Sequence, residues 1–223
     1  MKLTFNLVIL AFTLLSTLIR AEETAAPPTV AAEDAVTDDA PQLVLKAMAA
    51  TNVPVDPAGD VVMVQARTNK PSWVIYQDRA QGDIVAMRVS GPFSHGHLTK
   101  TVTVVPANRV LPGTPLAVAH QHQDANDPGT VQLFFFDGAN VLSEARWTKE
   151  RGWFHGTDCS VCVDQKKRYQ AISQNKILYA RASLNEHRKA GMRVGFQSVD
   201  YSGTIAEADR QGGNWVLAPL TQA

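Results

Sequence analysis

The stretch "VQLFFFDGANVLSEARWTKERGWFHGTDC", residues 131–159, contains a unit of β structure that occurs three times in this chain. It begins with an apolar strand and a turn bearing Gly. An alternating strand and a second turn, rich in Gly and aromatic residues, follow. Residues 72–98 and 192–220 repeat this order, and a further short apolar strand precedes each unit. The repeat length is about sixty residues, which indicates a repeat architecture. The equivalent aromatic positions are Tyr76, Phe135 and Phe196.

One unit supplies about four short strands, which is the amount of sheet in a propeller blade. A single sheet of this kind cannot bury both of its faces, so neighbouring units must stack. The predicted fold class is all-β, with β-propeller-like blades in a partial ring or in a ring closed by oligomerisation. The alternative is a β-sandwich whose hairpins resemble one another by chance.

Three units are fewer than the 4 to 8 blades that close a propeller. Self-association would solve this, because two chains would provide six blades, and the sequence therefore predicts a homo-oligomer. The third unit is expected to lack the last strand, which "TVTVV" supplies in the first unit. Residues 42–50 are expected to fill that gap, within one chain or across to a partner.

The first forty residues differ in composition from the rest of the chain. Residues 1–21 have one Lys before an apolar run, and Ile19 and Ala21 suit the −3 and −1 positions of a signal peptidase site, as in a secretory signal peptide. A membrane anchor is the alternative, but its apolar run would need roughly 20 residues. Residues 22–40 are acidic and are predicted to be disordered. The domain is expected over 41–223, with repeats near 61–113, 114–176 and 177–223. The predicted location is extracellular.

Charge excludes one class of partner. Residues 1–40 hold two of the 21 bases and six of the 21 acids, which leaves the remaining chain slightly basic. This excess is small and scattered, so no nucleic-acid partner is predicted.

Two kinds of short motif suggest metal or redox chemistry. Cys159 and Cys162 lie in "DCSVC", which fits a local disulfide, a redox pair or half a metal site. A secreted protein favours the disulfide. Two HxH pairs lack a third ligand at a fixed spacing, so neither a metal nor a cofactor is predicted. These pairs are His95 with His97 and His120 with His122.

The third unit carries the most specific pattern. Arg193 leads "RVGFQ", Glu207 ends "GTIAE", and Trp215 follows eight residues later. This pattern resembles the blade signature of the fungal and bacterial fucose-specific lectins of the Aleuria aurantia lectin type. The resemblance covers roughly residues 60–220, and the chain looks like a partial or degenerate member. It implies a six-bladed propeller in which Arg and Glu bind sugar hydroxyls and Trp stacks on the apolar face of the sugar.

The three units match the blade signature to different extents. In the third unit Arg210 occupies the nearer of the two Trp positions. The second unit has Gln132 in place of Arg, and it keeps Glu144, Trp147 and Trp153. The first unit has Trp73 in place of Arg, Ala86 in place of Glu and Phe93 near the second Trp position.

These matches predict one complete sugar pocket, with Arg193 and Glu207 facing Trp147 and Trp153 of the preceding unit. An indole covers the C–H face of a sugar, while a carboxylate accepts from hydroxyls and a guanidinium donates to them. Fourteen residues with a turn between them can place Arg193 and Glu207 side by side on adjacent strands. The alternatives are an exposed ion pair and tryptophans that serve only as core. The predicted sugar-binding set is completed by Glu144 and Trp215.

The sequence therefore predicts a secreted carbohydrate-binding lectin for fucosylated or similar glycans, without enzyme activity. A degenerate, non-catalytic interaction scaffold or effector is the first alternative. A propeller glycosidase is the second. Retaining hydrolysis requires two carboxyl groups about 5 Å apart, whereas Glu144 and Glu207 belong to different units.

Overall fold

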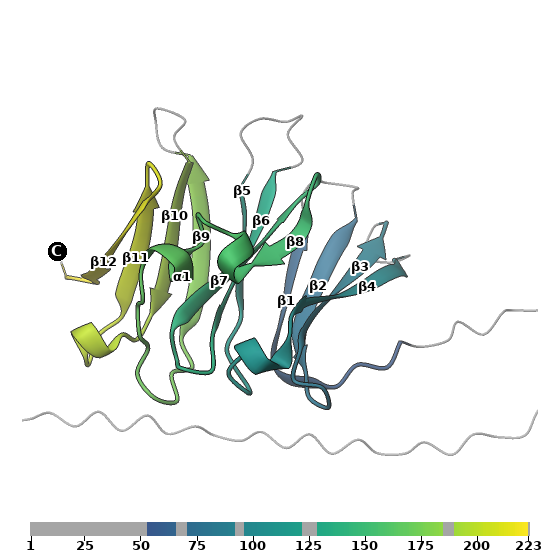
Figure 1. Cartoon of the computed structure of the whole chain (residues 1–223), viewed down its shortest axis with the longest axis horizontal. Helices are drawn as coiled ribbons and strands as arrows, with labels where there is room; N and C mark the ends of the chain where they lie inside the picture. The colour runs from purple at the N-terminus through teal and green to yellow at the C-terminus, as the bar shows by residue number, and fades with distance from the viewer. Residues whose placement is uncertain (1–52, 66–70, 92–95, 122–128, 185–189, 223) are drawn as a thin grey trace, which may run out of the picture. The chain divides into compact units, whose positions relative to one another are not determined.

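The computed structural model describes residues 53–65, 71–91, 96–121, 129–184 and 190–222. Within these ranges the chain forms three four-stranded antiparallel sheets, and each sheet is built from four strands that are consecutive in sequence (Figure 1). The all-β class and the three repeats of four strands are thereby confirmed. The predicted signal peptide (residues 1–21), the acidic segment that is predicted to be disordered (residues 22–40) and residues 42–50 lie outside the described residues.

The strand bounds are as follows. The first sheet consists of β1 (Pro57–Gln65), β2 (Ser72–Asp78), β3 (Ile84–Ser90) and β4 (His97–Val105). The second sheet consists of β5 (Ala117–Gln121), β6 (Thr130–Phe136), β7 (Leu142–Thr148) and β8 (Gly152–His155). The third sheet consists of β9 (Leu178–Leu184), β10 (Ala190–Phe196), β11 (Ala206–Gln211) and β12 (Asn214–Pro219).

The prediction that the third unit lacks its last strand is wrong. β12 pairs with β11 along its whole length, from Asn214 opposite Gln211 to Pro219 opposite Ala206. The third sheet is therefore complete, and it leaves no gap for residues 42–50 to fill. The residues "NWVLAP", whose burial alternates along the strand, form this last strand, as "TVTVV" does in the first sheet.

The strand register confirms the alignment of the three repeats. Glu207 of β11 lies opposite Gly195 of β10. Glu144 of β7 lies opposite Phe134 of β6 in the same way. In the first sheet the corresponding pair is Ala86 and Ile75. The residues that follow on the second strand of each sheet are Tyr76, Phe135 and Phe196, the positions that the sequence aligned.

Each sheet has two different faces. We call the face toward the next sheet in the chain the forward face, and the opposite one the back face. In the third sheet, which has no following sheet among the described residues, the back face packs on the second sheet and the forward face is the other one. The forward face of the first sheet packs on the back face of the second sheet, with Trp73 and Ile75 against Leu133 and Phe135. The forward face of the second sheet packs in the same way on the back face of the third, around Phe134, Phe136, Val194, Phe196 and Trp215.

The second sheet is covered on both faces, and this explains the apolar run "LFFF" (133–136) in β6. Phe135 points to the back face, while Phe134 and Phe136 point to the forward face. All three rings are buried. A strand between two neighbours has no solvent face and needs no polar alternation.

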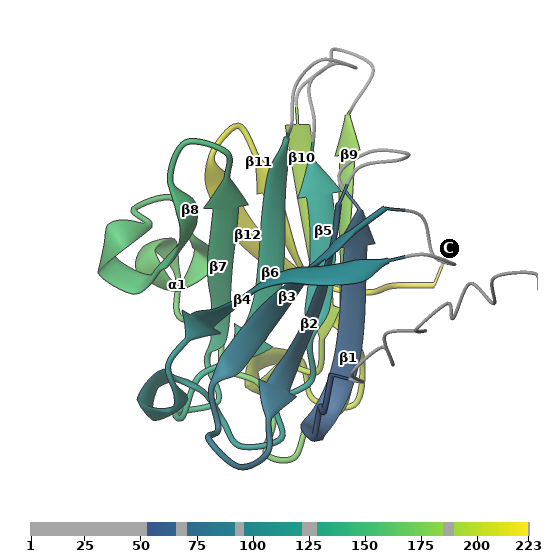
Figure 2. The ribbon, with the colours of Figure 1, turned by 90° about the vertical axis from the view of Figure 1, so that its right-hand side faces the viewer.

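The first strands of the three sheets, β1, β5 and β9, lie side by side (Figure 2). Two sheet faces remain uncovered by the described residues. On the back face of the first sheet, Val61 and Met63 are 55% and 45% exposed. On the forward face of the third sheet, Val216 is 62% exposed. No helix among the described residues has the length and apolar character needed to cross a membrane.

Candidate functional site

Arg193 and Glu207 form a pair on the forward face of the third sheet. Arg193 stands on β10 and Glu207 on the adjacent strand β11, two register positions apart. The Arg193 Nη1 and Glu207 Oε2 atoms are 3.4 Å apart, and the guanidinium side chain is mostly exposed. The hairpin thus places a cation and a carboxylate side by side and open to solvent.

Tyr179 of β9 orients the carboxylate of Glu207. Its hydroxyl donates a hydrogen bond of 2.7 Å to Glu207 Oε1. Burial, and then the hydrogen bond and negative charge of Glu207, raise the pKa of Tyr179 to about 12. The phenol therefore stays protonated and remains a donor at physiological pH.

Gly195 makes this contact possible. A Cβ atom at Gly195 would lie 2.0 Å from Cζ of Tyr179, because the tyrosine ring passes directly across the glycine. Tyr179 was not among the residues predicted from the sequence. The signal that could have found it is a glycine in the middle of the strand "RVGFQ", since such a glycine marks the close approach of another group.

A cavity of about 440 Å³ opens beside the Arg193–Glu207 pair. Asp209 and Asn214 add polar groups to its wall, and Val216 adds an apolar surface. A guanidinium donates to hydroxyl oxygens, and carboxylates accept from hydroxyl hydrogens. The volume and the mixed lining suit a small, hydroxyl-rich ligand.

Trp147 and Trp153 do not face this cavity. They pair with one another across β7 and β8, and they pack on Trp73 from the first sheet with ring centroids 6.2 and 6.0 Å away. They therefore lie on the back face of the second sheet. Arg193 lies on the far side of the third sheet.

The predicted pocket that combined these four residues is thus wrong in its pairing. Trp147 follows Glu144 by three residues, and side chains an odd number of positions apart point to opposite faces of a strand. Glu144 points forward to the third sheet, so Trp147 points back to the first. Trp73 fills the space between these two sheets, where the resemblance predicted an Arg.

Glu144 is fully buried between the second and third sheets. Its carboxylate accepts from Arg146 Nε at 2.6 Å and from the backbone N–H of Val163 at 3.0 Å. Burial raises the pKa of Glu144, and the neighbouring Arg146 acts in the opposite direction. Glu144 therefore offers no exposed oxygen to a ligand at this interface.

Arg210 of the third sheet closes the same interface. It donates to Gln121 Oε1 at 3.2 Å. With the amide of Gln132 turned toward the guanidinium groups, Gln132 accepts from Arg210 at 3.3 Å and from Arg146 at 2.9 Å. Gln132, predicted as the counterpart of Arg193, is thus part of a buried polar network.

Trp215 is also inaccessible. It lies on the back face of the third sheet, 2% exposed, with its ring centroid 6.2 Å from that of Phe134. The Arg210 guanidinium lies 5.7 Å from the centroid of the Trp215 ring. Of the predicted sugar-binding residues, only Arg193 and Glu207 meet at an open surface.

Cys159 and Cys162 form a disulfide. Both are buried, and they connect the short 3-10 helix η2 (Gly156–Asp158) to the helix α1 (Val163–Lys166). Among the residues that the structure describes, no group of three His, Cys, Asp or Glu is arranged to hold a metal ion. Phe93, His95 and His122 lie outside the described residues.

No protein-family model matches the sequence, and no curated protein does. Solved structures do match. A fungal lectin, Aleuria aurantia lectin, is described as a six-bladed β-propeller with fucose recognition. It aligns with 73% of this chain and 49% of its own, at a TM-score of 0.54 and 20% identity. AofleA from Arthrobotrys oligospora aligns with 74% of this chain and 42% of its own chain, at a TM-score of 0.53 and 19% sequence identity.

A variant of Aleuria aurantia lectin in complex with α-methyl-L-fucoside aligns at a TM-score of 0.50 and 15% identity, over 76% of this chain and 47% of its own. This chain therefore spans less than half the length of each of these three structures. At these identities the similarity shows the fold. The three sheets are successive blades of a β-propeller, and the chain has the architecture of a partial propeller.

Proposed function

We propose that this protein is a secreted, non-enzymatic lectin that binds fucose-containing or similar glycans at the Arg193–Glu207 pair. The observation that carries the proposal is the arrangement of this pair, which is open, hydrogen-bonded to Tyr179 and lines a cavity of about 440 Å³. The six-bladed structures with the same blade fold are described as fucose-recognising lectins. Their similarity supports the choice of ligand.

The geometry suits a sugar edge. Glu207 has one oxygen held by the Tyr179 hydroxyl and the other near Arg193. Both contacts fix the carboxylate plane before a ligand arrives, so less ordering entropy is lost on binding. The guanidinium presents several donors in a rigid fork to the ring oxygen and hydroxyls of a sugar.

Absence of enzyme activity is part of the proposal. Glu144 and Glu207 stand on different sheets, and Glu144 is sealed in the interface. They cannot act together on one glycosidic bond, which needs two carboxyl groups flanking it. Glu207 and Asp209 share one cavity, so a hydrolysis assay must accompany every binding assay.

A second copy of the chain is proposed to cover the site. The back face of the first sheet is apolar and exposed at Val61 and Met63. The equivalent back faces of the second and third sheets are buried against the forward face of the preceding sheet within the chain. The back face of a second copy would therefore fit on the forward face that carries Arg193. Two copies joined in this way would hold six blades.

Secretion is proposed from the signal-like residues 1–21. The Cys159–Cys162 disulfide supports it, because such bonds persist in oxidising compartments.

The direct test is a titration of the secreted protein with α-methyl-L-fucoside, followed by calorimetry. Arg193→Ala and Glu207→Gln are expected to abolish measurable binding while circular dichroism stays unchanged. Matched controls are Arg168→Ala and Glu150→Gln, because both residues are exposed and distant in sequence from the pair. Unchanged binding by Arg193→Ala would refute the site. Release of nitrophenol from an aryl fucoside would refute the non-enzymatic assignment.

Assembly is tested separately by sedimentation velocity. The parent chain is expected to sediment as a dimer, and Met63→Asp is expected to give a monomer by placing a charge on the apolar back face. A parent chain that stays monomeric at all concentrations would refute closure by a second copy.

A non-catalytic interaction scaffold is the second candidate. One observation favours it specifically. Inside the chain, the positions equivalent to the Arg193–Glu207 pair are filled, by Trp73 in the first interface and by the Arg210 network in the second. The register also places Val89 and Leu98 of the first sheet where the second sheet has Trp147 and Trp153. A second copy would thus offer aliphatic side chains in place of indoles. A glycan array without any signal would favour this candidate.

A further inference from the structure

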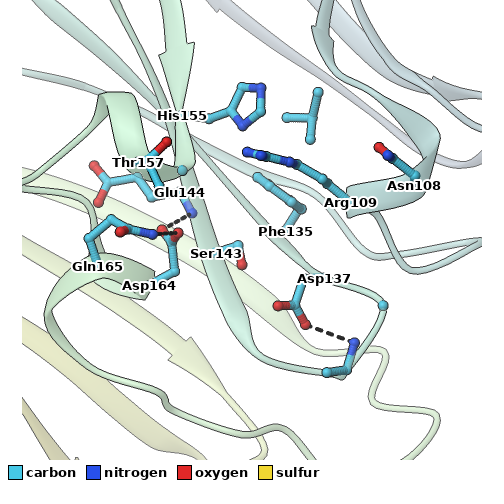
Figure 3. A pocket seen from close by; sticks show the side chains of 14 residues that line it. Asn108, Arg109, Phe135, Asp137, Ser143, Glu144, His155, Thr157, Asp164 and Gln165 are labelled. Carbon is cyan, nitrogen blue, oxygen red and sulfur yellow. Dashed lines mark hydrogen bonds between the residues drawn. The ribbon is translucent and has the colours of Figure 1, made fainter.

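A second cavity of about 440 Å³ lies between the first and second sheets, at the end remote from Trp73 (Figure 3). Its floor includes Val105 at the end of β4 and Phe135 of β6. Its walls come from the 3-10 helix η1 (Ala107–Arg109), the turn after β6, and the η2–α1 segment. The cavity shares no residue with the one beside Arg193.

Arg109 reaches into this cavity beside His155 (Figure 3). Gly156 has a φ of +56°, and a Cβ atom there would lie 2.5 Å from Arg109 Nη1. The absence of a side chain at Gly156 therefore gives the guanidinium its place. Within the part of the chain that the structure describes, no carboxylate forms an ion pair with Arg109. The exposed Arg109 is therefore not neutralised by a carboxylate among the described residues.

Three carboxylates line the cavity, and all of them are engaged. Glu144 accepts from Arg146 Nε at 2.6 Å and from the backbone N–H of Val163 at 3.0 Å. Asp137 Oδ1 accepts from the backbone N–H groups of Ala139 and Val141, each at 2.9 Å. Asp164 accepts from Gln165 Nε2 at 2.9 Å and from the backbone N–H of Glu144 at 3.3 Å. Each acid holds its local backbone in place, and this leaves Arg109 available to an outside ligand.

The wall is also rigidly supported. The disulfide between Cys159 and Cys162 joins η2 to α1. The backbone N–H of Val163, at the start of α1, donates to the buried Glu144 at 3.0 Å. Preformed sites of this kind lose little ordering entropy when a ligand binds.

We propose that this cavity binds a carboxylate-bearing sugar unit, such as a uronic acid, with Arg109 as the carboxylate partner. Arg109 offers a bidentate fork that matches a carboxylate. The hydroxyl of Thr157 and the amide of Asn108 serve sugar hydroxyls, and Phe135 with Val105 forms the apolar floor. A doubly charged phosphate fits less well, because Asp137 and Asp164 stand close to the single unpaired cation.

This inference rests on the proposed function only in that the ligand is a glycan. It uses a different cavity from the Arg193 site. The cavity has the volume of a small-molecule site, so one sugar unit of a longer chain would occupy it. The protein would then read two chemical features of a glycan, one neutral and one acidic.

The test is a titration of the isotope-labelled full chain with methyl β-D-glucuronide, followed by amide NMR. The shifts of Gly156 and Thr157 are expected to move. Arg109→Gln is expected to weaken this binding at least about tenfold, as the loss of a charge-assisted contact implies. The exposed Arg88→Gln variant is the matched control. Methyl β-D-glucoside, the neutral equivalent, is expected to bind at least about tenfold more weakly.

Three results would overturn the proposal: no movement of the Gly156 and Thr157 amides, equal binding of the glucoside, or unchanged glucuronide binding by a folded Arg109→Gln variant. The Arg193→Ala variant separates the two sites. Glucuronide binding that survives in Arg193→Ala supports an independent cavity, even where fucoside binding fails. If Arg193→Ala loses glucuronide binding and Arg109→Gln keeps it, the carboxylate binds at the Arg193 site, and the proposal for the Arg109 cavity is refuted.

Discussion

The closure of the first interface by Trp73 leads to a quantitative prediction. Trp73 is only 8% exposed and contacts both Trp147 and Trp153. A buried aromatic side chain covers about 150–250 Å², which at about 25 cal/mol per Å² corresponds to roughly 4–6 kcal/mol. Direct truncations of Trp or Phe in cores cost about 3–5 kcal/mol. Trp73→Ala is therefore expected to lower the free energy of unfolding by about 3–5 kcal/mol.

Thermal unfolding followed by far-ultraviolet circular dichroism measures this effect. Each kcal/mol shifts the midpoint by about 2–4 °C in a domain of this size, so a fall of roughly 6–20 °C is expected. The control is Val199→Ala, because this apolar side chain is half exposed and should cost under about 0.5 kcal/mol. A fall of less than about 2 °C for Trp73→Ala would show that the tryptophan does not fill the interface.

The remaining predictions concern the site and the disulfide. Gly195→Ala is expected to displace the Tyr179 ring, since the new Cβ would lie 2.0 Å from Cζ, and so to abolish glycan binding without unfolding; calorimetry and circular dichroism together test this. Tyr179 is expected to titrate near pH 12, and tyrosine Cζ NMR should show its pKa falling toward 10 in Glu207→Gln. Because the pKa is raised in the folded state, the contribution of Tyr179 to stability is present below pH 10 and lost as the pH rises toward 12; a titration of Tyr179 near 10 in the parent would contradict the contact. Replacing both Cys159 and Cys162 by Ala should cost about 2 kcal/mol or less in urea unfolding, because the closed loop is very short. A larger loss would mean that the disulfide holds more than its own turn.

The strand order and register were accessible from the sequence because short alternating strands recur with the same turn chemistry. Once Phe135 and Phe196 are aligned, pairing across the hairpin follows, and Glu144 and Glu207 fall on equivalent positions. The last strand of the third sheet was missed. "NWVLAP" starts directly after a Gly-Gly turn, and that turn marks a tight hairpin.

The sequence could not predict which face of each sheet packs against the preceding sheet, and therefore which residues meet at the site. Alternation places Glu144 and Trp147 on opposite faces of one strand. It does not say which of those faces meets the preceding sheet. That choice depends on how the sheets stack, which is a property of the long-range packing of apolar faces such as those of Leu133 and Val194. The same packing hides Glu144, a charge that its sequence position alone would place on a surface.

The second cavity was also beyond the reach of the sequence. Arg109 lies in a connection between sheets, and Gly156 follows β8. Their separation in the sequence does not predict that they meet, because their contact depends on how the first sheet packs against the second. A glycine with positive φ near the disulfide was the one local sign of a close approach.

The closed interfaces determine valency. Among the described residues one Arg–Glu pair is exposed, so under the proposed function a lone chain would offer a single sugar contact and could not bridge two cell surfaces through it. Agglutination of glycan-coated beads would therefore report on the joining of chains, whereas monosaccharide affinity would report on the pocket. The two assays would diverge on dilution, since cross-linking fails as soon as the partners separate.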